Sequence, residues 1–177
     1  MKKILILLCL PLIGFGQDLP FNRTGRVSYE GIVRVEGVSK KDLYKAANEW
    51  FTKAYIDNNL NDKIDVIKML DKEECKIIAK PRLTVIKWKS HVGDFLYTIT
   101  FQSKEGRYRY TIDNIYHYCS FCPSGGPIEN EDPICGKAQM FKKHWKFLKS
   151  YAHEDLLRIE ASLKRYLSQA GKYDDNW

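Results

Sequence analysis

The chain has 177 residues, of which 44% are hydrophobic, 13% aromatic and 29% charged, and its formal net charge is +7. This length predicts one domain, and the hydrophobic and aromatic content excludes a disordered tail or a linker protein. With 11 Gly and 6 Pro, the composition also excludes a fibrous or low-complexity chain.

The first sixteen residues have the pattern of an export signal. A basic start and an apolar run over 4–13 precede Gly14 and Gly16, which predicts cleavage between Gly16 and Gln17. A transmembrane anchor is the first alternative, but it needs about 20 apolar residues. Cleavage as a lipoprotein before Cys9 is the second, although leucines stand where small residues are required. Export would place a mature chain of 161 residues and charge +5 in the periplasm, in the envelope or outside the cell.

A strand and a helix open the mature chain. Residues 26–35 alternate between apolar and polar, which predicts a half-buried strand, and Gly31 within it suggests a bulge. Ser39 is a candidate N-cap. The apolar residues over 43–55 then recur at spacings of three and four, which predicts an amphipathic helix.

From residue 64 the hydrophobic period returns to two, which predicts a series of strands. Pro81 ends or offsets one of them because proline cannot donate to a strand ladder. Trp88 is expected on the same strand face as Thr84 and Ile86, and Gly106 is expected to take a positive φ in a hairpin turn. The expected strands are residues 64–70, 75–79, 83–89, 95–101 and 108–118.

The last third of the chain is expected to be a loop followed by a helix. Residues 119–136 have no period, and from 141 to 166 apolar residues recur at helical spacing. A helix of that length would measure roughly 40 Å and exceed a small sheet, so we expect a break near His153 or a free-standing second half. The predicted layout is a signal peptide (1–16), an α+β domain (17–118), a Cys-bearing loop (119–136) and a C-terminal helical region packing on the domain (137–177).

With residues 75–79 and 83–89 counted as one strand region divided at Pro81, the element order is β-α-β4-α, which predicts an α+β fold with an antiparallel sheet packed on helices on one face. The segments GRVSYEGIVRVEGVSKKDLYKAANEWF, DKEECKIIAK and LYTITFQSKEGRYRYTIDNI resemble, in this order, a secreted family of Bacteroidetes. That family is a domain of unknown function with a TATA-binding-protein-like fold, and the likeness covers residues 19–115. It implies a curved sheet on helices and no activity, because the family has none assigned.

Three cysteines in the loop are candidates for a structural disulfide, the default in an exported protein. We expect Cys135 to pair with Cys119 or Cys122, which would stabilise the fold by about 3 kcal/mol on the chain-entropy model. A zinc site of these three cysteines with His117 is one alternative, and free or redox-active thiols are another. Cys75 lies in a predicted strand and is expected in the core. No metal or other cofactor is predicted.

A basic stretch opens the last helix. Lys142, Lys143, Lys146 and Lys149 flank an apolar stripe, so this segment can contact an anionic membrane surface or an acidic partner. The favoured interpretation is a core-packed helix whose outer face is solvated. Export argues against nucleic acid as a partner, and the fold analogy to a DNA-binding protein carries no functional weight.

Aromatic residues alternate along the predicted hairpin. Tyr97, Tyr108 and Tyr110 project from one face of adjacent strands, where they form either the core against the helices or a cleft for an apolar ligand. The core is the favoured interpretation.

No hydrolase motif, phosphate loop, zinc-protease motif or catalytic carboxylate pair is visible, so the chain is not expected to be an enzyme. The leading hypothesis is an exported non-enzymatic binding protein for an envelope partner or a small apolar ligand. The alternatives are a membrane-surface or assembly role of the basic helix and a metal or redox function of the Cys loop.

Overall fold

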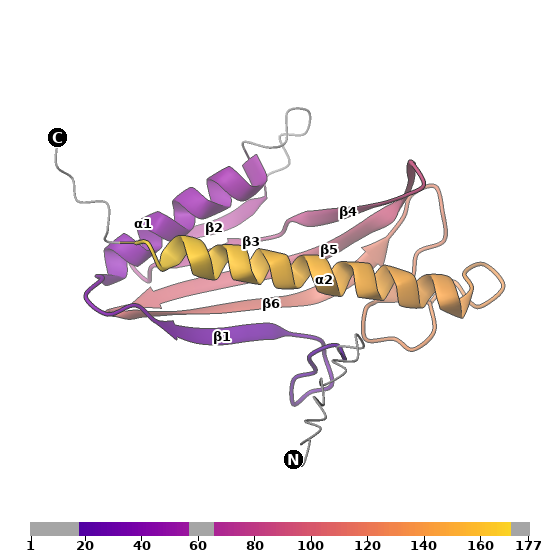
Figure 1. Ribbon diagram of the computed structural model, residues 1–177, viewed down its shortest axis with the longest axis horizontal. Helices are drawn as coiled ribbons and strands as arrows, with labels where there is room; N and C mark the ends of the chain where they lie inside the picture. The colour runs from indigo at the N-terminus through magenta and orange to yellow at the C-terminus, as the bar shows by residue number, and fades with distance from the viewer. Residues whose placement is uncertain (1–17, 57–65, 171–177) are drawn as a thin grey trace, which may run out of the picture.

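The computed structural model describes residues 18–56 and 66–170, so the predicted signal peptide and its cleavage site at Gly16 and Gln17 lie outside the described residues. The described chain forms an antiparallel sheet with two long helices on one face (Figure 1). Its elements are β1 (Tyr29–Arg34), α1 (Lys40–Phe51), a π-helical turn η1 (Thr52–Ile56), β2 (Ile67–Asp71), β3 (Lys76–Ala79), β4 (Arg82–Lys87), β5 (Ser90–Lys104), β6 (Arg107–Tyr118), β7 (Gly126–Pro127) and α2 (Lys142–Leu167).

The sheet is built around β5. Its main strand order is β1-β6-β5-β3-β2, while β4 pairs with the first part of β5 and β7 with the end of β6. The strands β3 and β4 therefore lie along the same edge of β5, and Pro81 stands in the gap between them. This confirms the α+β fold and the division at Pro81, and it adds the two-residue strand β7 to the predicted order.

The predicted hairpin is formed by β5 and β6. Lys104 pairs with Arg107, and Gly106 closes the turn with a φ of 66°, a conformation that glycine adopts without steric cost. The interior of the hairpin is regular except for one irregularity between Leu96 and Thr98. Asn114 has a positive φ of 52° in the facing part of β6.

Gly31 does not mark a bulge, and that prediction was wrong. The β1–β6 register runs without interruption from Tyr29 to Arg34. Glycine is needed at this position because the ring of Tyr110 on β6 lies over it. A Cβ atom on Gly31 would lie only 2.6 Å from the Tyr110 hydroxyl.

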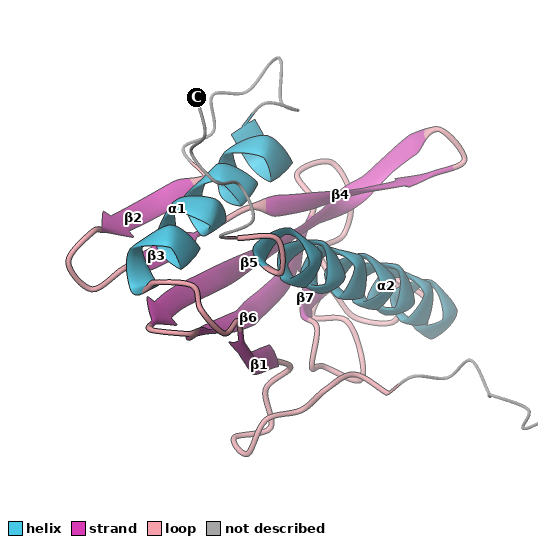
Figure 2. Cartoon of the chain, turned by 60° about the vertical axis from the view of Figure 1, so that its left-hand side comes forward, coloured by secondary structure: helices cyan, strands magenta, loops and turns pink. Residues whose placement is uncertain are grey.

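The helix α1 begins as predicted at Ser39, whose Oγ accepts a hydrogen bond of 3.1 Å from the backbone N–H of Asp42. Its buried face packs on the sheet, and the Trp50 indole N–H donates to Ser162 Oγ of α2 at 3.2 Å. The two helices therefore form one layer on the same face of the sheet (Figure 2).

Trp88 does not lie in a strand, contrary to expectation. The strand β4 ends at Lys87, which pairs with Ser90, so Trp88 and Lys89 form a two-residue turn. Their φ angles of 49° and 65° give the pattern of a type I′ turn, which joins twisted strands without splaying them. Trp88 consequently points away from the sheet at the tip of this turn.

The helix α2 is continuous over 26 residues, so the expected break near His153 is absent. The expectation assumed a small sheet, but β5 has 15 residues and spans roughly 50 Å, longer than the roughly 39 Å of the helix. His153 is buried, and its Nδ1 lies 2.7 Å from the Tyr29 hydroxyl of β1. The middle of α2 is thus held on the sheet.

Candidate functional site

The tyrosines that were candidates for a ligand cleft are core residues. Tyr97, Tyr108 and Tyr110 are all nearly inaccessible to solvent on the sheet face that the helices cover. The Tyr110 hydroxyl donates to Glu160 of α2, and the Tyr97 hydroxyl lies 3.3 Å from that of Tyr55. The cleft prediction is therefore wrong, and the alternative interpretation as core is confirmed.

Burial controls the acid–base chemistry of this tyrosine cluster. Loss of solvation raises the pKa of Tyr108 to about 12, with a smaller contribution from Tyr110. Within the described part of the chain the Tyr108 hydroxyl has no hydrogen-bond partner. Glu160 also accepts a hydrogen bond of 2.6 Å from Lys164, which raises the pKa of that lysine. Tyr108 therefore stays protonated and Lys164 stays charged at neutral pH.

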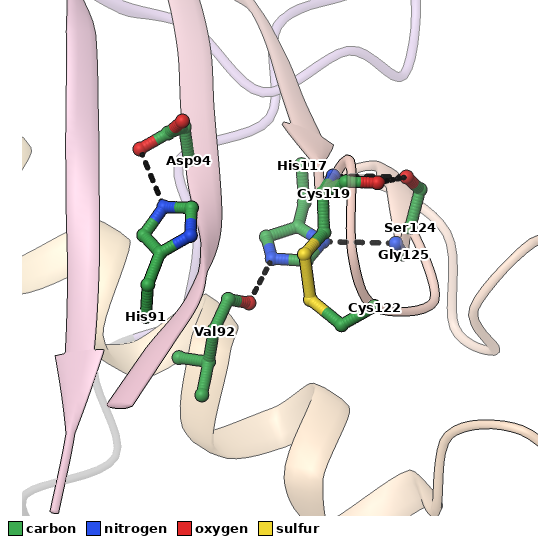
Figure 3. Close-up of a disulfide and its surroundings, with 8 residues drawn as sticks. All are labelled: His91, Val92, Asp94, His117, Cys119, Cys122, Ser124 and Gly125. Atoms are coloured by element: carbon green, nitrogen blue, oxygen red, sulfur yellow. Dashed lines mark hydrogen bonds and ion pairs between the residues drawn. A yellow bond between two sulfur atoms is a disulfide. The ribbon is translucent and has the colours of Figure 1, made fainter. Parts of the chain in front are cut away.

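The Cys-bearing loop contains a disulfide, but the pairing differs from the expected one. Cys119 bonds to Cys122, and their Cα atoms are 5.2 Å apart (Figure 3). Cys135 is a free, partly buried thiol, and Cys75 is buried in the core as predicted. The tight turn brings the two nearby cysteines together, and Ser124 Oγ accepts a hydrogen bond from the Cys119 N–H at 3.0 Å.

His117 lies beside this disulfide and is fully buried. The Gly125 N–H donates to its Nδ1 at 2.9 Å, so Nε2 carries the proton and donates to the Val92 carbonyl at 3.0 Å. Burial lowers the pKa of the imidazole, which keeps it neutral. Both ring nitrogens are occupied and two of the cysteines are oxidised, so the zinc alternative does not fit this loop.

The four lysines of the basic helix fall into two pairs. Lys142 forms an ion pair with Glu131 of the loop, and Lys149 donates to the Asn130 carbonyl at 3.0 Å. Partial burial lowers the pKa of Lys149. In contrast, Lys143 and Lys146 are exposed to solvent. Two of the predicted contact residues therefore fasten α2 to the loop, and the other two face outward.

The sheet face opposite the helices is open, and the sequence did not single out its residues as a site. Arg34 on β1 pairs with Arg107 on β6, which in turn pairs with Lys104 on β5. Residues directly opposite in antiparallel strands project to the same side, so these three cations form one row across three strands. Arg109, two residues further along β6, projects to the same side next to this row, and its Nη2 lies 3.5 Å from the Gln102 Oε1.

We call Arg34, Lys104, Arg107 and Arg109 the cationic strip. All four residues are exposed, and a shallow groove of about 200 Å³ runs between the last three and Ile32. Ile32 is 69% exposed, so the groove has an apolar wall beside the charges. The hairpin turn at Gly106 places Lys104 opposite Arg107. Because this pairing follows from the turn alone, the sequence could have revealed these two residues of the strip.

Residues 29–118 match the family described as a domain of unknown function (DUF4468) with TBP-like fold. The chain belongs to this family. No curated protein matches the chain.

Two solved structures share the fold of this DUF4468 member. A TBP-like protein from Parabacteroides distasonis is 16% identical, with a TM-score of 0.66 over 86% of this chain and 98% of the other. A DUF4468 family protein from Bacteroides ovatus is 14% identical, with a TM-score of 0.55 over 82% of this chain and 90% of the other. At these identities the likeness shows the fold alone.

Family membership confirms the resemblance seen in the sequence and the curved antiparallel α+β fold. The family's description assigns no function. The matched range ends at Tyr118, so the Cys-bearing loop and α2 lie beyond it, whereas the cationic strip lies within it.

Proposed function

We propose that this protein is an exported, non-enzymatic binding protein that holds an acidic partner protein of the cell envelope on its open sheet face. The row formed by Arg34, Arg107 and Lys104 carries this proposal. Like charges in directly opposing strand positions destabilise a sheet. An acidic partner would relieve that repulsion and gain orientation from the planar guanidinium groups.

The shape of the open face favours a protein over a small apolar ligand. The aromatic residues that could have formed an apolar cavity are sealed beneath the helices. The groove beside the cationic strip, at about 200 Å³, is smaller than the roughly 300–1,000 Å³ of typical small-molecule pockets. An exposed surface that combines Ile32 with arginines is typical of protein interfaces, where arginine and apolar residues are enriched.

Two features support export and the absence of catalysis. A basic, apolar and small-residue N-terminus has the pattern that signal peptidase cleaves, and the Cys119–Cys122 disulfide is compatible with an oxidising compartment. Among the described residues, large pKa shifts fall on buried tyrosines held in their protonated form and on Lys164, which Glu160 holds in its charged form, and both ring nitrogens of His117 are engaged. Such groups stabilise the core.

The test is site-specific photocrosslinking in the host cell. A photoreactive residue replaces Ile32 on the open face in one version of the full chain and Ala161 on the exposed side of α2 in another. We expect the residue at position 32 to crosslink to one acidic envelope protein, identified by mass spectrometry, and the residue at position 161 to give no such product.

Charge reversal supplies the matched control. The double variant Arg34→Glu, Arg107→Glu should abolish the crosslink from position 32, whereas Lys41→Glu, Lys45→Glu changes the net charge equally on exposed positions of α1 and should leave it intact. Loss of the crosslink in both variants would show that only net charge matters, and its persistence in both would remove the strip as the binding site. Either result overturns the proposal.

A further inference from the structure

Three exposed aromatic residues stand at one end of the molecule. Trp88 at the β4–β5 turn is 89% exposed, Phe121 in the disulfide loop is 96% exposed, and Phe141 before α2 is 78% exposed. Figure 1 places the β4–β5 turn, the loop after β6 and the first turn of α2 at the same end of the molecule. We call these three residues the aromatic tips.

Local structure holds the aromatic tips outward. Trp88 occupies the two-residue turn between β4 and β5 in the left-handed conformation, and its side chain is largely exposed. The Lys87 ammonium lies 4.9 Å from the Trp88 ring centroid and 4.2 Å from that of Phe147 on α2, which fastens the turn to the helix. Phe121 lies inside the four-residue loop that the Cys119–Cys122 disulfide closes. These large rings therefore remain in water although burial would be favourable.

The same end carries an excess of positive charge. Two of the three acidic side chains of the loop are ion-paired, Glu131 with Lys142 and Asp132 with Lys137 at 3.2 Å, and the third, Glu129, accepts a hydrogen bond from the Val27 N–H. The charges of Lys89, Lys143 and Lys146 are exposed and add to that of Lys87. Aromatic side chains at projecting tips, surrounded by lysines, match the interface of an anionic bilayer, where aromatic rings sit at headgroup level and lysines contact lipid phosphates.

We propose that this end of the protein docks peripherally on an anionic lipid bilayer, with the aromatic tips in the interface and the lysines on the headgroups. A bilayer fits better than a protein partner because the three rings project from separate segments of the chain and are each more than three-quarters exposed. Among the described residues no helix is both long and apolar enough to cross a membrane. This surface is separate from the cationic strip, so the two proposals stand or fall independently.

Vesicle flotation of the full chain, as its host processes it, tests this inference. The probes are vesicles of phosphatidylcholine alone and vesicles with about 30% phosphatidylglycerol, at about 0.1 M and about 0.5 M salt. We expect binding to the anionic vesicles only, with a loss of about tenfold at the higher salt because screening weakens the lysine contacts. Equal binding to neutral vesicles, or none to either, overturns the inference.

Variants separate the aromatic tips from charge alone. Trp88→Asn keeps the turn, because asparagine tolerates the left-handed conformation, and together with Phe121→Ser it should weaken binding at least tenfold. The control Ile32→Ser removes an exposed apolar side chain on the open sheet face and should leave vesicle binding unchanged. Binding that depends on Lys143→Gln, Lys146→Gln but not on the aromatic variants would contradict docking through the tips.

The fluorescence of Trp88 gives a readout that folding defects do not imitate. Trp50 and Trp145 are buried, so they are shielded from lipid-borne quenchers. Trp177 lies outside the described residues, so both proteins carry Trp177→Phe. Vesicles with brominated acyl chains should quench the emission of the protein that retains Trp88 and not that of Trp88→Asn. Quenching of equal size in both proteins would overturn the proposed insertion.

Discussion

The two faces of the sheet differ sharply although the same strands build both. On the covered face, Phe95, Ile99 and Phe101 of β5 pack beneath the helices and are fully buried. On the open face, the residues between them include Leu96 and two threonines, with the cationic strip alongside. The alternation of the strands thus separates a surface that holds the fold together from a surface that is available to partners.

The largest effect should come from neighbouring residues on opposite faces of β5. Phe95→Ala should lower the free energy of unfolding by about 3–5 kcal/mol, because the ring is fully buried against His117 and Trp145. Leu96→Ala, on the open face, should change it by less than about 0.5 kcal/mol. Urea denaturation measures both values. Similar losses in the two variants would mean that the open face is also a packed surface.

The second contrast is between the buried histidine His117 and an exposed residue of β5. Burial lowers the pKa of His117, so the unfolded chain, with a pKa near 6.5, takes up its proton first as the pH falls. Stability is therefore complete above about pH 6.5 and declines as the pH drops toward the folded-state pKa. His117→Gln should cost about 1–3 kcal/mol at pH 8 by breaking the network and should flatten this decline.

Thermal denaturation between about pH 8 and pH 5 measures the slope. Burial also lowers the pKa values of His144 and His153, so a smaller slope should remain in the His117 variant. Leu96 on the open face of β5 does not titrate and supplies the control, so Leu96→Gln should keep the full slope. If the His117 variant keeps the full slope as well, the buried imidazole is not its main source.

The third contrast lies within the covered face. Tyr110→Phe removes the hydrogen bond to Glu160 and should cost about 1–2 kcal/mol. Tyr108→Phe removes a buried hydroxyl without a partner among the described residues and should be neutral or stabilising by up to about 1 kcal/mol. Changes of opposite sign in the free energy of unfolding, measured in the same denaturation assay, would confirm that a buried hydroxyl stabilises this layer only when it has a hydrogen-bond partner. A loss in Tyr108→Phe would contradict it.

The smallest effect should come from the open face. Arg107→Thr removes the central charge of the row and should raise the free energy of unfolding by about 0.2–1 kcal/mol, less at high salt. The same variant should weaken the photocrosslink from position 32. A gain in stability with a loss of binding is expected where a residue is kept for a partner. A loss of stability would show that the row is not repulsive.

The sequence was sufficient to predict the residues of the covered sheet face, but it was not sufficient to predict the cationic strip on the open face. Apolar residues at every second position predict the buried set, because the hydrophobic effect acts on each strand separately. The row of Arg34, Arg107 and Lys104 joins residues about 70 positions apart, so it depends on the β1–β6 register, which no local pattern specifies. The Cys119–Cys122 pairing was also missed, because no local pattern in the sequence distinguishes it from a bond to Cys135. Contacts such as that of Gly125 against the Trp145 ring shape the loop, and these arise only in the folded chain.

The unbroken course of α2 fixes the orientation of the two proposed surfaces. This helix runs from the end that carries the aromatic tips to the region where it meets α1, on the face opposite the cationic strip (Figure 1). Because α2 is continuous over roughly 39 Å, it holds the two ends of the molecule in a fixed position relative to each other. A protein standing on a bilayer by its aromatic end would therefore present the open sheet face sideways to its surroundings, clear of the lipid. Both surfaces could be occupied at the same time, so membrane attachment would concentrate the binding face within one layer above the bilayer.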